Sequence, residues 1–291
     1  MSTKRRNSTV TIGDLALHVV ESGPPEGRPF LFLHGWPESW RTWTGVMDAA
    51  DAGRSDARII AIDLPGIGES TGTAGSGSKL QLARTVHALV RHLDLTGVTL
   101  VGHDAGGMAA YAYLRWFDDA ERVIIMNTAI PGVDPWNEVL RNPYIWHFGL
   151  HAVPDLPEIL VRGRQAEYFD YFYDVLSADP SRISAASRAA HAAAYGGDGA
   201  LTAGFDLYRA FPQDALDNAA FAEAGAVDIP LLYVRGDREG GDVDAYARGF
   251  RDAGVKNLTT ATVPHAGHFA QEEQPANVWR IINGFAHSTA N

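Results

Sequence analysis

The 291-residue chain contains no cysteine, which excludes disulfide bonds, thiolate metal sites and cysteine nucleophiles. It has no apolar run long enough to cross a membrane, and its first residues lack the apolar stretch of a signal peptide. Lysine and arginine are outnumbered by acidic residues, 24 against 35, so the formal net charge is -11. This charge disfavours a nucleic acid or an anionic membrane surface as a partner. We therefore expect a cytoplasmic protein that acts on a neutral small molecule.

Short apolar runs that predict strands alternate with helical patterns over much of the chain. Continuous apolar runs of this kind are typical of parallel strands that are buried on both faces, while the first two segments predict a hairpin at the edge of the sheet. We predict an α/β fold, with a mostly parallel sheet flanked by helices. The expected strands lie at residues 9–12, 15–21, 29–34, 58–63, 98–101, 122–127, 229–235 and 258–263.

The pattern changes between residues 131 and 222, where aromatic-rich helices are expected and no strand is evident. We interpret this segment as a helical cap inserted into a core formed by residues 1–130 and 223–291. Most of the cap aromatics must pack against one another, as large apolar side chains do in any helical layer. Only a few of them can face a ligand.

A strand–turn–helix motif lies near the middle of the chain. Residues 98–101 lead into Gly102-His-Asp-Ala-Gly-Gly107, after which the sequence favours a helix. Small residues around a sharp turn are typical of a nucleophile elbow, whose central residue here is Asp104. A carboxylate that attacks a saturated carbon forms an ester that activated water can cleave, whereas serine would form a stable ether. The alternative is an aspartate that only caps the helix.

Two further pieces follow Asp104 in the chain. The loop after the next-to-last expected strand contains Asp237, Glu239 and Asp242, and the last strand is followed by His268 within Gly267-His-Phe269. The order nucleophile, acid, histidine is that of α/β-hydrolase triads. His265 is expected to be a loop residue, and the histidine that precedes Asp104 is expected to point away from a substrate, since neighbouring residues of a strand face opposite sides.

Together with His34-Gly-Trp-Pro-Glu38, these motifs make the sequence resemble the α/β-hydrolase family over nearly its whole length. Within that family it resembles the cap-bearing, aspartate-nucleophile branch of epoxide hydrolases and dehalogenases. The resemblance implies that His268 is the general base and that Glu239, at the family's Gly-x-x-acid spacing, orients it. Asp237 and Asp242 stay open as alternatives. Asn127 stands where some relatives keep the acid, which favours Glu239.

The same resemblance implies an oxyanion hole and two proton donors. The backbone amides of Trp36 and Ala105 would form the hole, with a cis peptide bond before Pro37. Epoxide hydrolases of this kind place two donors in the cap, usually tyrosines. Tyr208 matches the second position, and His147 replaces the tyrosine at the first, with Tyr144 in reserve.

These expectations define an epoxide hydrolase that converts a small apolar epoxide to a vicinal diol through an ester on Asp104, without a metal or an organic cofactor. The alternative is a haloalkane or haloacid dehalogenase that uses the same aspartate. The halide ligands of haloalkane enzymes would fall at Ala105 and Trp36, whereas in the fluoroacetate-type enzymes Trp146 and Tyr208 would hold the halide. Ala105 and Met108 stand where the fluoroacetate-type enzymes carry arginines, which argues against an acid substrate. A third hypothesis is that the protein is a non-catalytic ligand-binding homologue. Whether the chain forms a homodimer stays open.

Overall fold

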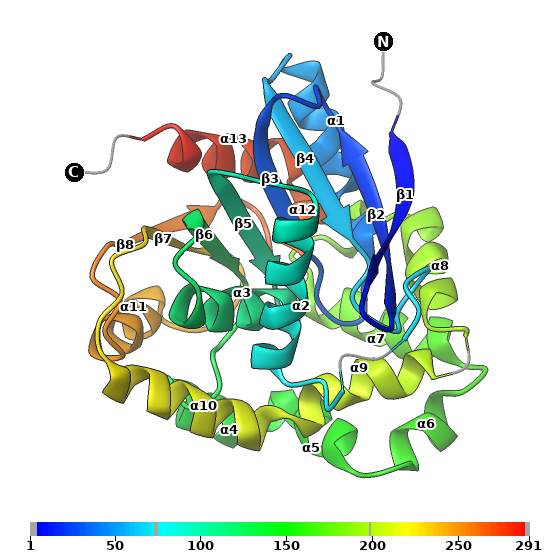
Figure 1. The fold of residues 1–291 in the computed structure, drawn as a ribbon. Helices are drawn as coiled ribbons and strands as arrows, with labels where there is room; N and C mark the ends of the chain where they lie inside the picture. The colour runs from blue at the N-terminus through cyan, green and yellow to red at the C-terminus, as the bar shows by residue number, and fades with distance from the viewer. Residues whose placement is uncertain (1–4, 73–74, 198, 289–291) are drawn as a thin grey trace.

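The computed structural model describes residues 5–72, 75–197 and 199–288. Its strands form one eight-stranded sheet in the order β1-β2-β4-β3-β5-β6-β7-β8 (Figure 1). The strands are β1 (Arg6–Ile12), β2 (Leu15–Ser22), β3 (Arg28–Leu33), β4 (Ala57–Ile62), β5 (Val98–His103), β6 (Ala120–Met126), β7 (Leu231–Gly236) and β8 (Leu258–Val263).

Strands β3 to β8 pair in parallel with one another, while β1 pairs antiparallel with β2 and β2 pairs antiparallel with β4. The prediction of a mostly parallel sheet with a hairpin at one edge is therefore confirmed. Because the parallel strands share one direction, their carboxyl ends lie along the same edge of the sheet. In open α/β sheets that edge is where ligands bind.

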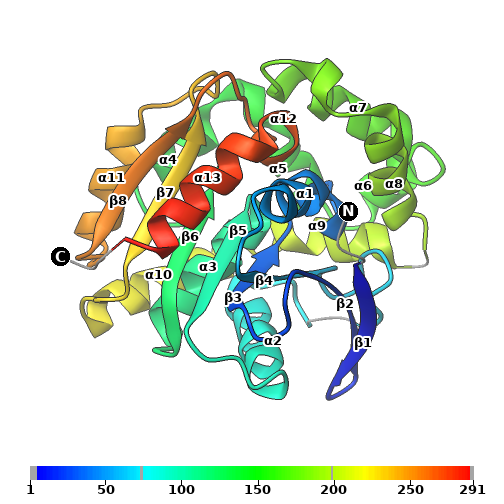
Figure 2. The same cartoon turned by 90° about the horizontal axis from the view of Figure 1, so that it is seen from above.

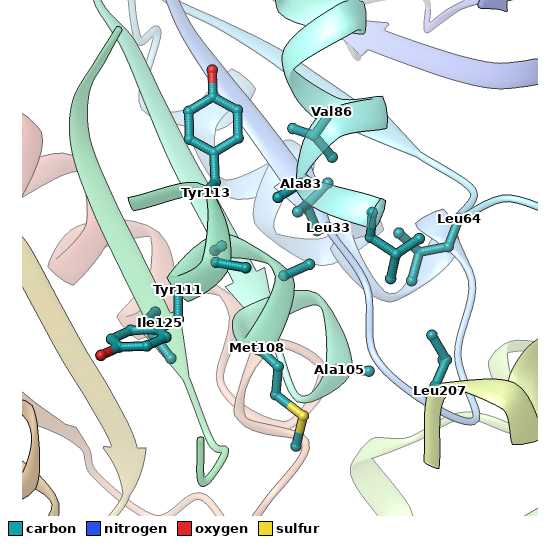
Figure 3. Packing of buried hydrophobic residues seen from close by; sticks show 14 of the residues in the cluster. Leu33, Leu64, Ala83, Val86, Ala105, Met108, Tyr111, Tyr113, Ile125 and Leu207 are labelled. Atoms are coloured by element: carbon teal, nitrogen blue, oxygen red, sulfur yellow. The ribbon is translucent and has the colours of Figure 1, made fainter. Parts of the chain in front are cut away.

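Helices cover both faces of the sheet (Figure 2). The short 3-10 helix η1 (Trp40–Trp43), α1 (Thr44–Ala52), α12 (Ala270–Glu273) and α13 (Pro275–Ala286) pack on one face, and α2 (Lys79–His92), α3 (Ala105–Trp116) and α11 (Val243–Asp252) pack on the other. Figure 3 shows Ala83 of α2 beside Leu33 of β3, with Val86 of α2 and Met108 of α3 in the same cluster. Burying these side chains on both faces removes a large apolar area from water and is the main stabilising term of the core.

The described residues between β6 and β7 contain helices and turns but no strand. Figure 1 shows several of these helices gathered on one side of the sheet. The last of them ends at Ala224, so the boundary predicted at 222 falls within its final turn. The helices are α4 (Trp136–Arg141), η2 (Pro143–Ile145), α5 (Trp146–Ala152), α6 (Leu156–Val161), α7 (Gln165–Leu176), η3 (Pro180–Arg182), α8 (Ala185–Ala194), α9 (Ala200–Arg209) and α10 (Phe211–Ala224).

The helical segment, which we call the cap, is hydrogen-bonded to the core. The buried ammonium of Lys79 in α2 lies 2.8 Å from Asp214 Oδ2 in α10, and its Nζ also donates to the carbonyl of Leu207 in α9. The Tyr173 hydroxyl of α7 donates to the carbonyl of Pro37 at 2.8 Å. These contacts fix the cap helices relative to the edge of the sheet that carries the strand ends.

Candidate active site

Asp104 lies on the turn between β5 and α3, as the elbow motif predicts. Its φ of 49° and ψ of -120° are rarely adopted by residues with a side chain, so the local backbone is strained. The turn is possible only with glycine nearby, because a Cβ on Gly106 would lie 2.5 Å from the backbone oxygens of Leu33 and His34. The Asp104 side chain makes no hydrogen bond that caps α3, so helix capping does not explain it.

The loop predicted to form the oxyanion hole follows β3 and contacts Asp104 directly. The Trp36 amide donates to Asp104 Oδ1 at 3.0 Å, and the Trp36–Pro37 peptide is cis, as expected. Gly35 must be a glycine, since a Cβ there would lie 2.4 Å from the Cβ of Asp104. Ala105 is the first residue of α3, so its amide is one of those that a helix leaves without an intrahelical partner. Of the two amides predicted for the hole, the Trp36 amide contacts the Asp104 carboxylate and the Ala105 amide belongs to the next residue of the chain.

His268 connects Asp104 to an acid. Its Nε2 lies 3.8 Å from Asp104 Oδ2, and its Nδ1 lies 2.8 Å from Glu239 Oε1. The structure therefore brings Glu239, rather than Asp237 or Asp242, to the histidine. Asp237 is exposed, and Asp242 caps α11 by accepting a hydrogen bond from the amide of Asp244.

Glu239 has further partners that the sequence reasoning missed. Asn127, predicted only as the residue that replaces an acid, donates from Nδ2 to Glu239 Oε2 at 2.8 Å. Arg235, near the end of β7, approaches the same oxygen at 3.1 Å. Burial alone would raise the pKa of Glu239, but Arg235, His268 and Asn127 together lower it. The four-residue spacing of Arg235 and Glu239 does not indicate this ion pair, because such spacing brings charges together on a helix, whereas Arg235 lies in β7 and Glu239 in the loop that follows.

The histidine before the elbow points into the core, as expected. His103 is fully buried and contacts Glu38 Oε2 through Nδ1 at 2.7 Å, while its Nε2 lies 2.8 Å from the carbonyl of His268. Burial alone would lower the pKa of His103, but Glu38 raises it to about 9. Burial opposes the ionisation of Glu38, yet His103 is the main reason that its pKa falls to about 2. This buried ion pair holds the loop that carries His268.

A cavity of about 380 Å³ lies between the strand ends and the cap. Its size falls within the range of small-molecule sites. Asp104 and His268 line it on the core side, and Tyr208 and His147 line it on the cap side. Phe148 and Phe172 are among the apolar cap side chains around it.

Both predicted cap donors are buried. The Tyr208 and His147 rings lie 5.8 Å apart, and each also contacts the ring of Trp36. Burial, and then the charge of Asp104, raise the pKa of Tyr208 well above its ordinary value, so it keeps its proton at neutral pH. Burial, followed by the charge of His268, lowers the pKa of His147 to about 3. His147 is therefore a neutral imidazole that can donate one hydrogen bond.

Two other cap candidates lie elsewhere. Tyr144 is 85% exposed and lies at the mouth of the cavity. Trp146 does not line the cavity, and its indole nitrogen points to the Tyr171 hydroxyl on the surface. A halide site built from Trp146 and Tyr208 is therefore incompatible with this arrangement.

The eight-stranded sheet, the strained elbow at Asp104 and the contacts of His268 with Asp104 and Glu239 are features of an α/β hydrolase. The family model for the alpha/beta hydrolase fold matches residues 28–275, and the chain belongs to this family. Within the described residues, no helix is both long and apolar enough to span a bilayer.

Proteins of similar sequence and structure are known. A soluble epoxide hydrolase from Corynebacterium sp. (strain C12) is 28% identical over 282 residues, which cover 94% of this chain and 95% of that protein. Cfl2 from Burkholderia cenocepacia is 30% identical, with a TM-score of 0.87 over 97% of this chain and 96% of that one. The epoxide hydrolase CorEH is 26% identical, with a TM-score of 0.84 over 97% of this chain and 98% of its own.

Proposed function

We propose that the protein is an epoxide hydrolase that converts a small apolar epoxide to a vicinal diol. The observation that carries the proposal is the placement of Asp104 beneath the cavity. One carboxylate oxygen is held by the Trp36 amide and the other faces His268, with Tyr208 and His147 on the opposite wall. The similarity to proteins named as epoxide hydrolases supports the same reaction.

The first step forms an ester. Asp104 Oδ1 is engaged by the Trp36 amide, so Oδ2 is the oxygen that attacks a ring carbon of the epoxide. The carbon–oxygen bond of the ring breaks, and its electron pair stays on the ring oxygen. That oxygen takes a proton from the Tyr208 hydroxyl while His147 donates a hydrogen bond to it. The transfer matters because an unassisted alkoxide is a poor product at neutral pH.

The second step cleaves the ester. His268 removes a proton from water, and the resulting hydroxide attacks the Asp104 carbonyl carbon rather than the substrate carbon. Oδ1 becomes the oxyanion, and it already lies at the Trp36 amide, with the Ala105 amide as the second donor. The intermediate collapses to release the diol oxygen, which takes the proton from His268. The proton left on the new Asp104 carboxyl group returns to the Tyr208 phenolate, so both side chains are restored. Glu239 stabilises the imidazolium that exists between these proton transfers.

A dehalogenase remains the competing reaction because it begins with the same attack. The cavity argues against it, because Trp146 lies outside the site and the Trp36 indole nitrogen lies against Gly204 of α9. Apolar cap walls and the absence of arginine at Ala105 and Met108 also disfavour a halogenated acid. A non-catalytic ligand-binding role would not require the complete set of contacts around Asp104 and His268.

Three expectations belong to the same proposal. We place the cap at residues 131–222. We also place the protein in the cytoplasm, because a neutral epoxide can reach the enzyme there without the enzyme binding to a membrane. A homodimer is a further proposal, and sedimentation velocity at micromolar concentration distinguishes it from the monomer.

The test is a single turnover of styrene oxide with excess enzyme in water labelled with heavy oxygen. We expect the first diol to lack the label and the peptide that contains Asp104 to gain it. The His268→Gln variant should accumulate an adduct one substrate heavier than the protein, and Asp104→Asn should form none. A labelled diol with an unlabelled Asp104 would mean direct attack by water. If only a haloalkane forms the adduct, the dehalogenase reading replaces this one.

A further inference from the structure

The acid that supports His268 is paired with a buried cation. Arg235 is 5% exposed, and its Nη2 lies 3.1 Å from Glu239 Oε2 and donates to the Gly240 carbonyl at 2.6 Å. Its Nη1 donates to the Tyr233 hydroxyl at 2.9 Å, and the guanidinium lies 4.5 Å from the ring centroid of Tyr246. The cation is therefore fixed from several sides.

The two carboxylate oxygens of Glu239 therefore have different partners. Oε1 accepts from His268 Nδ1, whereas Oε2 accepts from Asn127 Nδ2 and faces Arg235. An acid in this position stabilises the imidazolium through its negative charge. A cation at its far oxygen offsets part of that charge, so the same hydrogen bond stabilises the imidazolium less.

We propose that Arg235 is a positioning residue that fixes Glu239 and moderates its charge, so that His268 stays neutral at a lower pH than Glu239 alone would permit. The proposal rests on the role of His268 given under the proposed function. A neutral His268 can accept a proton from water. A protonated one would instead form an ion pair with Asp104, 3.8 Å away, and withdraw both groups from reaction.

The charges around His268 show why a second cation has a large effect. Three carboxylates favour the imidazolium, and a neutral imidazole on the cap adds no charge. Among the described groups that face His268, the one cation besides Arg235 is itself paired with Glu38, so its opposing charge is largely offset. The carboxylates are Asp104, Glu239 and Glu273, the neutral ring is His147, and the cation is His103, whose ring lies 4.9 Å from that of His268.

The test measures the pKa of His268 in the free enzyme from the ring-proton NMR signals, with His268→Gln to assign the resonance. Arg235→Gln removes the charge and keeps a donor, and we expect the pKa of His268 to rise by about one unit, as Coulomb's law gives for a cation several ångströms away. Arg235→Lys keeps the charge and should stay within about 0.3 unit of the wild type. Arg238→Gln, an exposed arginine of the same loop, is the matched control and should not move it.

A kinetic readout follows from the same shift. In Arg235→Gln, the acidic limb of the ester-cleavage rate should move to higher pH by the same amount, while ester formation at high pH is unchanged. An unmoved His268 titration in folded Arg235→Gln overturns the proposal. A rise of a full unit in the pKa of His268 in Arg235→Lys also overturns the proposal. The lysine variant provides this test if the glutamine variant does not fold. A shifted titration in a protein that opens no epoxide would instead leave this inference standing and remove the proposed function.

Discussion

Two buried histidines of the core and two of the cap helix α5 differ in charge. His18 of β2 and His103 of β5 each contact a buried carboxylate, at 2.9 Å and 2.7 Å, and the pKa of each is raised. His147 and His151 of α5 are just as hidden from solvent but contact aromatic rings, and burial lowers their pKa values to about 3 and about 2. His151 has one polar contact, with the Tyr168 hydroxyl at 2.8 Å.

The difference shows that burial alone does not decide the charge of a histidine. Burial disfavours the imidazolium everywhere, and only a carboxylate within hydrogen-bonding distance reverses the effect. His103 is thereby a cation that holds the loop of His268, and His191 of the cap is likewise raised in pKa by Glu272, 2.6 Å away. His147 and His151 are neutral rings that pack on aromatic side chains, and His147 can still donate a hydrogen bond into the cavity.

The largest effect is expected when His103 loses its carboxylate partner and so resembles His147 and His151. Glu38→Gln leaves the imidazolium without its carboxylate, and removal of one partner of a buried pair costs roughly 3–5 kcal/mol of stability. We expect a loss of this size in urea unfolding at pH 7. Glu69→Gln, a mostly exposed carboxylate near His18, is the control and should change stability by less than about 0.5 kcal/mol. A loss below about 1 kcal/mol in Glu38→Gln would mean that the pair is dispensable.

His151 and His103 should make opposite contributions to the pH dependence of stability. The pKa of His151 is about 2 in the folded protein and about 6.5 unfolded, so the unfolded chain binds the extra proton below pH 6.5 and stability falls on acidification. This slope is at most about 1.4 kcal/mol per pH unit, or about 2 kcal/mol between pH 6.5 and pH 5. His151→Phe should flatten it. A slope equal to that of the wild type would show that His151 is not neutral in the fold.

His103 of the core makes its contribution to stability pH-dependent on the alkaline side. Because the pKa of His103 is raised to about 9, its contribution is complete below pH 6.5 and is lost as the pH rises towards 9. The free energy of unfolding measured by urea titration across both windows therefore separates the two kinds of histidine.

The smallest expected effect concerns the cap histidine that faces the cavity. His147→Phe keeps the packing and removes the donor, so we expect kcat/KM for the epoxide to fall about tenfold, the value of one hydrogen bond. His147→Gln, which retains a donor, should lose less. Tyr171→Phe alters an exposed cap tyrosine and should leave kcat/KM unchanged. Equal losses in the phenylalanine and glutamine variants would indicate a packing role for His147.

Much of the site could be predicted because it follows strand ends. Asp104 comes directly after β5, Glu239 and His268 lie in the loops that follow β7 and β8, and parallel strands bring such residues to one edge of the sheet. Glycine supplied the second signal, because the elbow and the oxyanion loop approach each other too closely for any side chain.

The rest depended on contacts that a single sequence does not encode locally. Lys79 meets Asp214 across 135 residues, and no pattern in either segment indicates the other. Trp146 and His147 are neighbours in one short helix, yet only His147 faces the cavity. Seven residues are too few for periodicity to define the buried face of α5.

The bonds between cap and core have a consequence for the timescale of ligand exchange. The cap is held to the core through Asp214, Tyr173 and the Ala178 amide, the last of which donates to Glu273 at 2.8 Å. Hinged lids open in microseconds to milliseconds, whereas exposed side chains rotate in picoseconds to nanoseconds. Exposed residues border the cavity at its mouth, among them Glu138, Asn142 and Asp242. We therefore expect the diol to leave when exposed side chains at the mouth of the cavity rotate, while the cap and the core stay together.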